Sequence, residues 1–430
     1  MRWRAPLCVA TLVATLAPPP VATAAAAAPG ARVDGRFSTL WLYATDSRAG
    51  DPRSTLRNRL RTTVGDGELH NLRFEFAGRQ EINLDRATAG DRVDYQIQEA
   101  YLAADGLARR TDLVVGRQYI PEAAATAIDG GRVAFHLGER WLAGGFAGAT
   151  LKDNGPHIQQ DFRSYGAFVA YATLDYRLQL SAVTDRFQGE SDRNSINLQS
   201  SGRLGDKTHL YTSATVDLGQ PTANPLLSNL YVDLDYRATS ALSTSVVYSL
   251  FQTFYYLASG NAGTFDNEDT PVEPLLPDTS SAATTHRIEG RTSYRLGRHY
   301  YLDGNLRYQL RTQDGLSDTN AGVGVRDGNL LGSGVEATAR YTLSLADALD
   351  TENLLLRLSR TFFDNLQVDG SILYRRSALE IEQVVRPATV YSASAYLTLG
   401  RRWYAGLNLD HTREPDLTAT TLFVQAGMRF

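Results

Sequence analysis

The chain has 430 residues, a formal net charge of −4 at pH 7 and one cysteine. That cysteine, Cys8, lies in the N-terminal segment that we expect to be removed on export, so the exported protein has no cysteine for a disulfide, a thiolate metal site or a Cys-x-x-Cys-His haem attachment and is not itself a c-type cytochrome. The mildly acidic balance indicates no polyanionic partner, and we expect no nucleic-acid binding. With 22 Tyr against 15 Phe and 36 Gly, the composition favours strands with alternating polar and apolar positions.

The first 28 residues have the three parts of a secretory leader. Arg2 and Arg4 precede an apolar core, and small residues including Ala22-Thr23-Ala24 follow it. The core is too short to span a bilayer as a helix. We therefore expect residues 1–28 to be a signal peptide and residues 29–430 to form the exported protein. No later stretch approaches the ~18 consecutive apolar residues of a membrane helix.

From Val33 onward the sequence predicts strands of about 9 to 13 residues, separated alternately by short and longer connections. The longest connection, at about 255 to 284, is acidic and contains Asp266, Glu268 and Asp269. Counting these strands predicts an all-β fold, a single transmembrane antiparallel up-and-down β-barrel of about 22 strands (range about 18 to 22) with short periplasmic turns and longer extracellular loops. The expected strands lie at about 33–44, 54–64, from 72, 95–104, 111–118, 130–137, 141–150, 163–174, 176–187, 194–204, 208–218, 230–237, 242–254, 286–296, 299–311, 319–327, 335–345, 353–362, 366–377, 389–399, 402–412 and 419–430.

Several strands carry charged residues at every second position. Arg57, Arg59 and Arg61 share one face of their strand, opposite Leu56 and Leu60. An arginine at mid-depth on the lipid face costs about 2–4 kcal/mol, so this face must point to the lumen or lie near a rim. The same alternation assigns further charged residues to the inner face, namely Arg73, Glu75, Arg291 and Arg307.

The last strand has one apolar and one polar face. Leu422, Val424, Met428 and Phe430 share the apolar face, while Gln425 and Arg429 lie between them. This pattern, with its final aromatic residue, resembles the C-terminal signature of Gram-negative outer-membrane barrels. The resemblance implies an outer-membrane location in contact with lipid, and a last strand that the barrel-insertion machinery reads.

A barrel of twenty-two strands is roughly 4 nm across at the backbone, which side chains cannot fill. Its lumen could therefore hold infolded loops, be flattened, stay open or enclose another protein. The segment from Tyr119 to Asp129 lies where the constriction loop of porins lies, and Gly116-Arg117-Gln118 with Asp129-Gly130 is similar to porin segments. The resemblance implies that Glu122 and Asp129 face Arg57, Arg59, Arg61, Arg117 and Arg132 across a pore. Alternatively, these charges only neutralise one another in the wall.

Two functions remain open. The first is a porin-like channel for passive passage of small polar solutes through a charged lumen. The second is a non-catalytic sheath, because the strand order and the lack of a plug domain are similar to the barrels that enclose secreted multihaem cytochromes. We expect no enzyme, since no Gly-x-Ser-x-Gly, His-Glu-x-x-His or Walker loop occurs, and we expect no cofactor or metal.

Overall fold

The computed structural model describes residues 31–48, 52–66, 72–85, 93–124, 126–150, 161–219, 225–252, 283–347, 349–379 and 384–430. The expected signal peptide, residues 1–28, lies outside the described residues, and so does the acidic connection except for positions 283 and 284. Within the described ranges, no helix is long and apolar enough to cross a membrane.

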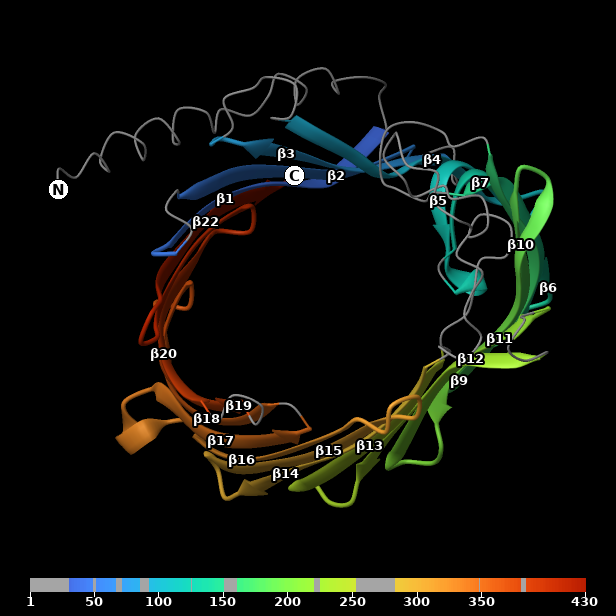
Figure 1. Ribbon diagram of the computed structural model, residues 1–430. Coiled ribbons are helices and arrows are strands. Elements are labelled where there is room, and N and C mark those ends of the chain that lie inside the picture. The colour runs from blue at the N-terminus through green and yellow to red at the C-terminus, as the bar shows by residue number, and fades with distance from the viewer. Residues whose placement is uncertain are drawn as a thin grey trace, which may run out of the picture.

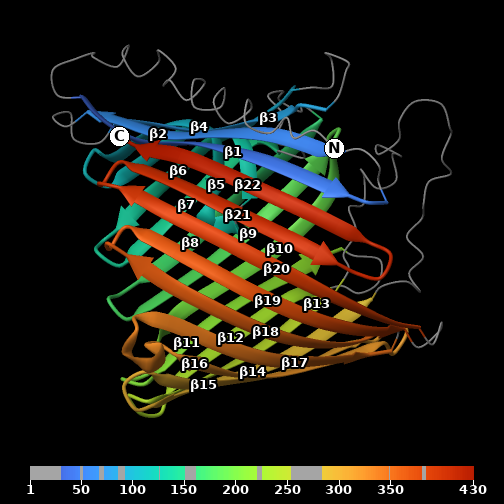
Figure 2. The same ribbon diagram turned by 90° about the vertical axis from the view of Figure 1, so that its left-hand side faces the viewer.

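The described residues form one closed antiparallel sheet of 22 strands, which confirms the predicted fold and strand number. Each strand pairs with its neighbour in sequence, and β1 also pairs with β22, so the sheet closes into a ring (Figure 1). The strands run obliquely across the wall (Figure 2), as barrel closure requires. The strands are β1 (Ala31–Asp46), β2 (Arg53–Asp66), β3 (Leu72–Asn83), β4 (Val93–Leu107), β5 (Thr111–Ile120), β6 (Thr126–Leu137), β7 (Trp141–Thr150), β8 (Phe162–Ala172), β9 (Tyr176–Phe187), β10 (Glu190–Arg203), β11 (Thr208–Leu218), β12 (Leu226–Arg237), β13 (Leu242–Gln252), β14 (Thr284–Leu296), β15 (Tyr300–Arg311), β16 (Ser317–Asp327), β17 (Val335–Ala346), β18 (Leu349–Phe362), β19 (Leu366–Leu379), β20 (Val384–Leu399), β21 (Trp403–Arg413) and β22 (Thr418–Arg429).

Within the described ranges, two short 3-10 helices interrupt this pattern, η2 (Pro121–Ala123) between β5 and β6 and η4 (Leu330–Gly332) between β16 and β17. Several strands begin earlier than the sequence alternation predicts. β6 begins at Thr126 rather than near 130, and β12 begins at Leu226 rather than near 230. β12 is longer because its first residues, from Leu226, still pair with β11, on the far side of a register shift between Thr215 and Val216.

The seam between β1 and β22 is closed by backbone and side chains together. The backbone N–H of Gly35 donates to the carbonyl of Phe430 (2.8 Å), and the N–H of Phe430 donates to the carbonyl of Gly35 (3.0 Å). On the inner side, Arg36 Nε donates to Tyr404 Oη (2.9 Å), and a Cβ on Gly427 would lie 2.3 Å from that oxygen. Tyr404 therefore fills the space that the absent Gly427 side chain leaves at the seam.

The two faces of the sheet differ as the alternation predicts. On β3 and β4, Leu72, Phe74 and Leu102 are exposed on the outside, while the residues between them, including Ala103 at 0% exposure, face the interior. The outer face also carries exposed aromatic residues at the barrel end with the short connections, where one interfacial girdle would lie: Trp141, Tyr236, Tyr300, Trp403 and Phe430. An apolar outside on a closed barrel is the architecture of a transmembrane β-barrel.

Glycines allow close strand contact where β5, β6 and β7 meet. Gly130 and Gly148 are paired across β6 and β7. A Cβ on Gly130 would lie 2.1 Å from the carbonyl oxygen of Ala147, and a Cβ on Gly148 would lie 2.6 Å from that of Asp129. No larger residue fits either position without a backbone shift.

Candidate pore wall

The hairpin of β5 and β6 leaves the wall and folds into the barrel. The ladder between β4 and β5 begins at the pair of Ala100 and Arg117, whereas β5 and β6 stay paired as far as Ile120 and Thr126. The tip of the hairpin, with η2, therefore extends beyond the wall ladder, and Figure 1 shows it inside the ring. The tip of this connection therefore lies inside the barrel.

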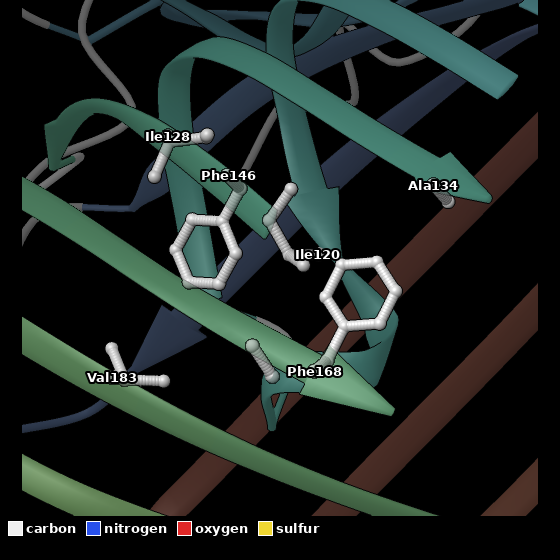
Figure 3. Close-up of a cluster of buried hydrophobic side chains, with 7 residues drawn as sticks. Ile120, Ile128, Ala134, Phe146, Phe168 and Val183 are labelled. Carbon is white, nitrogen blue, oxygen red and sulfur yellow. The ribbon is translucent and has the colours of Figure 1, made fainter. Parts of the chain in front are cut away.

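An apolar cluster fixes the hairpin to the inner wall. Ile120 and Ile128 of the hairpin are 0% exposed and pack with Phe146 of β7, Phe168 of β8 and Val183 of β9 (Figure 3). Full burial of an Ile side chain stabilises a contact by about 1.5–3 kcal/mol. The hairpin is thus held on one wall and does not hang freely in the lumen.

A buried ion pair holds the tip of the hairpin. Glu122 accepts two hydrogen bonds from Arg132, with Oε1 to Nη2 at 2.7 Å and Oε2 to Nε at 3.2 Å. The two side chains are 6% and 12% exposed. The Arg132 guanidinium also lies 5.2 Å from the ring centroid of Phe168. Arg132 therefore connects Glu122 of the tip with the aromatic ring of Phe168 on β8.

A second buried pair lies where the hairpin leaves the wall. Arg117 donates from Nε and Nη2 to the two oxygens of Asp129 (2.8 and 2.7 Å) and from Nη1 to the carbonyl oxygen of Ile97 on β4 (2.9 Å). Ile97 has no partner residue on β5, because the described ladder between β4 and β5 ends at Ala100. The Arg117 guanidinium therefore supplies the hydrogen-bond donor that a backbone N–H of β5 would otherwise supply. The Arg117 side chain is 5% exposed.

These two pairs differ from the arrangement that the porin resemblance implied. Glu122 and Asp129 do not face arginines across the lumen, because each is already bonded to an arginine of its own hairpin, Arg132 or Arg117. Desolvated carboxylates need such direct partners, and a partner across a wide barrel cannot provide one. In this geometry each of these four charges has its partner within the hairpin.

The arginines of β2 lie on the inner face in a row with carboxylates of β3 and β4. Arg57 pairs with Glu81 (2.7 Å), and Arg61 lies 3.4 Å from Glu99 and 3.9 Å from Glu75. Next in the row, Arg73 pairs with Glu75 and with Asp105, and Arg59 lies opposite Arg79. The side chain of Arg61 is 66% exposed although it points into a closed barrel. Among the described residues, nothing covers this part of the wall.

The opposite wall carries a second charged region. Arg291 pairs with Glu289 (2.5 Å) and Arg307 pairs with Asp318 (2.5 Å). Near the barrel end with the short connections, a recess of ≈ 950 Å³ follows the inner face from β10 to β18. Its lining contains more basic than acidic side chains, with Arg203, Lys207, Arg237, Arg291, Arg326, Arg340 and Arg357 against Asp206, Asp235, Asp303 and Glu336.

Sequence reasoning missed Arg326 and Arg340 of this recess. Their neighbours Val325 and Tyr341 are exposed on the outside, so the alternation of β16 and β17 could have assigned both arginines to the inner face. Arg326 lies 4.2 Å from the ring centroid of Tyr301, and Arg340 donates to Asn305 Oδ1 (2.5 Å). Among the described residues, neither forms an ion pair, and no group of His, Cys, Asp and Glu could hold a metal ion.

Comparison with known proteins finds structural likeness only. No family model matches the sequence, and no curated protein matches it significantly. Among solved structures, OccAB4 of Acinetobacter baumannii matches with 11% identity and a TM-score of 0.43, over 93% of this chain and 98% of that one. OpdL of Pseudomonas aeruginosa matches with 10% identity and a TM-score of 0.44 (93% and 99%), and OccD3 of the same organism with 8% and 0.44 (93% and 91%). Such values do not identify a function.

Proposed function

We propose that this protein is a porin-like channel of the Gram-negative outer membrane, through which small polar solutes pass passively. One observation carries the proposal: inside a closed barrel with an apolar outer face, arginine side chains on two walls have most of their surface accessible. Arg61 on one wall and Arg291 on the other have side chains 66% and 60% exposed. A water-accessible row of charges gives polar solutes a path that lipid does not.

The permeation path is proposed to follow the two charged walls. Its lining residues are Arg57, Arg59, Arg61, Arg73, Glu75, Arg291 and Arg307. Among the described residues, Arg59, Arg79, Arg237 and Arg326 make no ion pair, which favours anionic solutes and solutes rich in hydrogen-bond acceptors. The role of Glu122, Arg132, Arg117 and Asp129 is to hold the hairpin that narrows the lumen from one side.

The outer surface is proposed to contact outer-membrane lipid, and residues 1–28 to be removed on export. Leu422, Val424, Met428 and Phe430 are proposed as the signal that the barrel-insertion machinery reads. Sequencing the N-terminus of protein purified from outer membranes tests the signal peptide directly. A mature chain that retains Met1 would contradict it. The proposed role needs no cofactor and no catalytic step.

Conductance across a planar bilayer tests the channel. Purified protein should give stepwise currents, and the reversal potential in a salt gradient should show a preference for anions. A barrel that stays silent until a bound partner is stripped away would instead support the alternative, a sheath around a partner such as a secreted multihaem cytochrome. A barrel that is silent with and without a partner would contradict the channel.

A further inference from the structure

The outer face of β1 to β4 carries a continuous chain of polar side chains. Thr39 Oγ1 donates to Asn58 Oδ1 (2.8 Å), Asn58 Nδ2 donates to Gln80 Oε1 (3.0 Å), and Gln80 Nε2 donates to Tyr95 Oη (3.2 Å). One residue comes from each of the four strands, which form the blue wall in Figure 1. The four residues are direct partners in the β1–β2, β2–β3 and β3–β4 registers.

This chain lies on the membrane side of the wall. Gln80 alternates in phase with Leu72 and Phe74, which are 45% and 42% exposed on the outside. Asn58 lies between Leu56 and Leu60, so apolar residues flank it both above and below. The amides are therefore inside the apolar band and not at its edges.

Lipid does not satisfy the hydrogen-bonding groups of this chain. Asn58 and Gln80 each have two amide N–H groups, and within the described residues each donates only one of them, along the chain. The Tyr95 hydroxyl accepts from Gln80, which leaves its O–H free to donate. Hydrocarbon offers no acceptor, and an unmatched amide in an apolar medium is unfavourable by several kcal/mol.

A recess lies beside the polar chain. Its volume is ≈ 570 Å³, and its outer lining includes Phe37, Leu60, Gly78 and Ile97. The register shift between Ala77 and Gly78 breaks the regular pairing of β3 with β4 at this point. Tyr95 lines this recess and is 56% exposed, and its hydroxyl accepts from Gln80 on the neighbouring strand. An exposed aromatic ring and a recess thus lie side by side on one face.

We propose that this face of β1 to β4 is an interface with a second copy of the same chain. Amides are both donors and acceptors, so two copies related by a two-fold axis can satisfy each other's Asn58 and Gln80. The same axis would bring Tyr95 of one copy to the recess of the other. By contrast, the outer face from β15 to β18 presents exposed Leu306, Val323 and Leu356, as expected for contact with lipid.

Site-directed crosslinking in lipid vesicles tests the interface. The only native cysteine is Cys8, in the expected leader. Leu60→Cys lies beside the polar chain without altering it, and Leu306→Cys on β15 is the matched control on the far wall. A short bis-maleimide should give a crosslinked dimer with Leu60→Cys and not with Leu306→Cys. Equal crosslinking of the two, or none with Leu60→Cys, would overturn the proposal.

The second measurement is the mass of the folded protein in mild detergent. The wild type should contain at least two copies, and the double variant Asn58→Leu with Gln80→Leu should contain one. Thr244→Val with Thr292→Val, an outward polar pair on β13 and β14, should leave the wild-type mass unchanged. A single wild-type copy with lipid bound to this face, or a different protein crosslinked at Leu60→Cys, would overturn self-association and assign the face to that occupant.

Discussion

Removal of Arg132 should release the tip of the inward hairpin. In Arg132→Ala, Glu122 would remain 6% exposed without a partner, and breaking such a buried pair is unfavourable by about 3–5 kcal/mol. Burial of Ile120 and Ile128 opposes release by about 3–6 kcal/mol in total, at about 1.5–3 kcal/mol for each side chain. The two free-energy terms are comparable, so we expect the tip to leave the wall in a fraction of the molecules at any time, which exposes Glu122 to water in the lumen.

Single-channel recording in a planar bilayer detects this release. The Arg132→Ala channel should show increased open-channel noise, because the tip moves in the path of the current. Glu122→Leu combined with Arg132→Leu should restore a quiet current, since replacing a buried pair by apolar residues is near neutral. Arg57→Ala is the control, because its pair with Glu81 is 30% exposed on both sides and contributes about 0–1 kcal/mol. Equal noise in Arg132→Ala and the wild type would refute the reasoning.

Three further substitutions test the wall and the seam. Replacing Arg57, Arg59 and Arg61 of β2 together by serine should move the reversal potential toward cation selectivity, because the glutamates of β3 and β4 lose their partners. An unchanged reversal potential would show that this row does not line the permeation path. Gly427→Ala should destabilise the folded barrel by about 1–3 kcal/mol through overpacking against Tyr404, whereas Gly290→Ala, with nothing within 4 Å of its Cβ, should match the wild type in urea unfolding from vesicles. In the same assay, Arg117→Ala should lose about 3–5 kcal/mol, because Asp129 stays buried and unpaired, and a loss below 1 kcal/mol would contradict that role.

The strand number and the inner face could be predicted because side-chain direction alternates strictly along a strand. Arg57 and Arg291 follow a period of two with apolar neighbours, and hydrocarbon excludes charge from one face. The sequence also predicts a strand at 319–327, and β16 lies there, at Ser317–Asp327.

The path of the hairpin tip could be predicted only in part. Position in the chain indicated a connection inside the barrel, but alternation fails where both faces of a strand are buried, as at Arg117 and Gln118, which are 5% and 2% exposed. The ion-pair partner of Glu122 could not be predicted from the sequence either. Any arginine of the lumen could have paired with Glu122, and only the fold of the tip brings it to Arg132.

The pairing of β1 with β22 has a consequence for how the molecule forms. Every other ladder joins strands that follow one another in the chain, but this one joins Arg36 to Arg429 and Asp46 to Ala419. Until β1 and β22 pair, each of them has an edge of backbone N–H and C=O groups for which hydrocarbon offers no hydrogen-bond partner. Ring closure is therefore the most non-local event in folding, and we expect it to be the step at which assembly is slow and open to outside assistance.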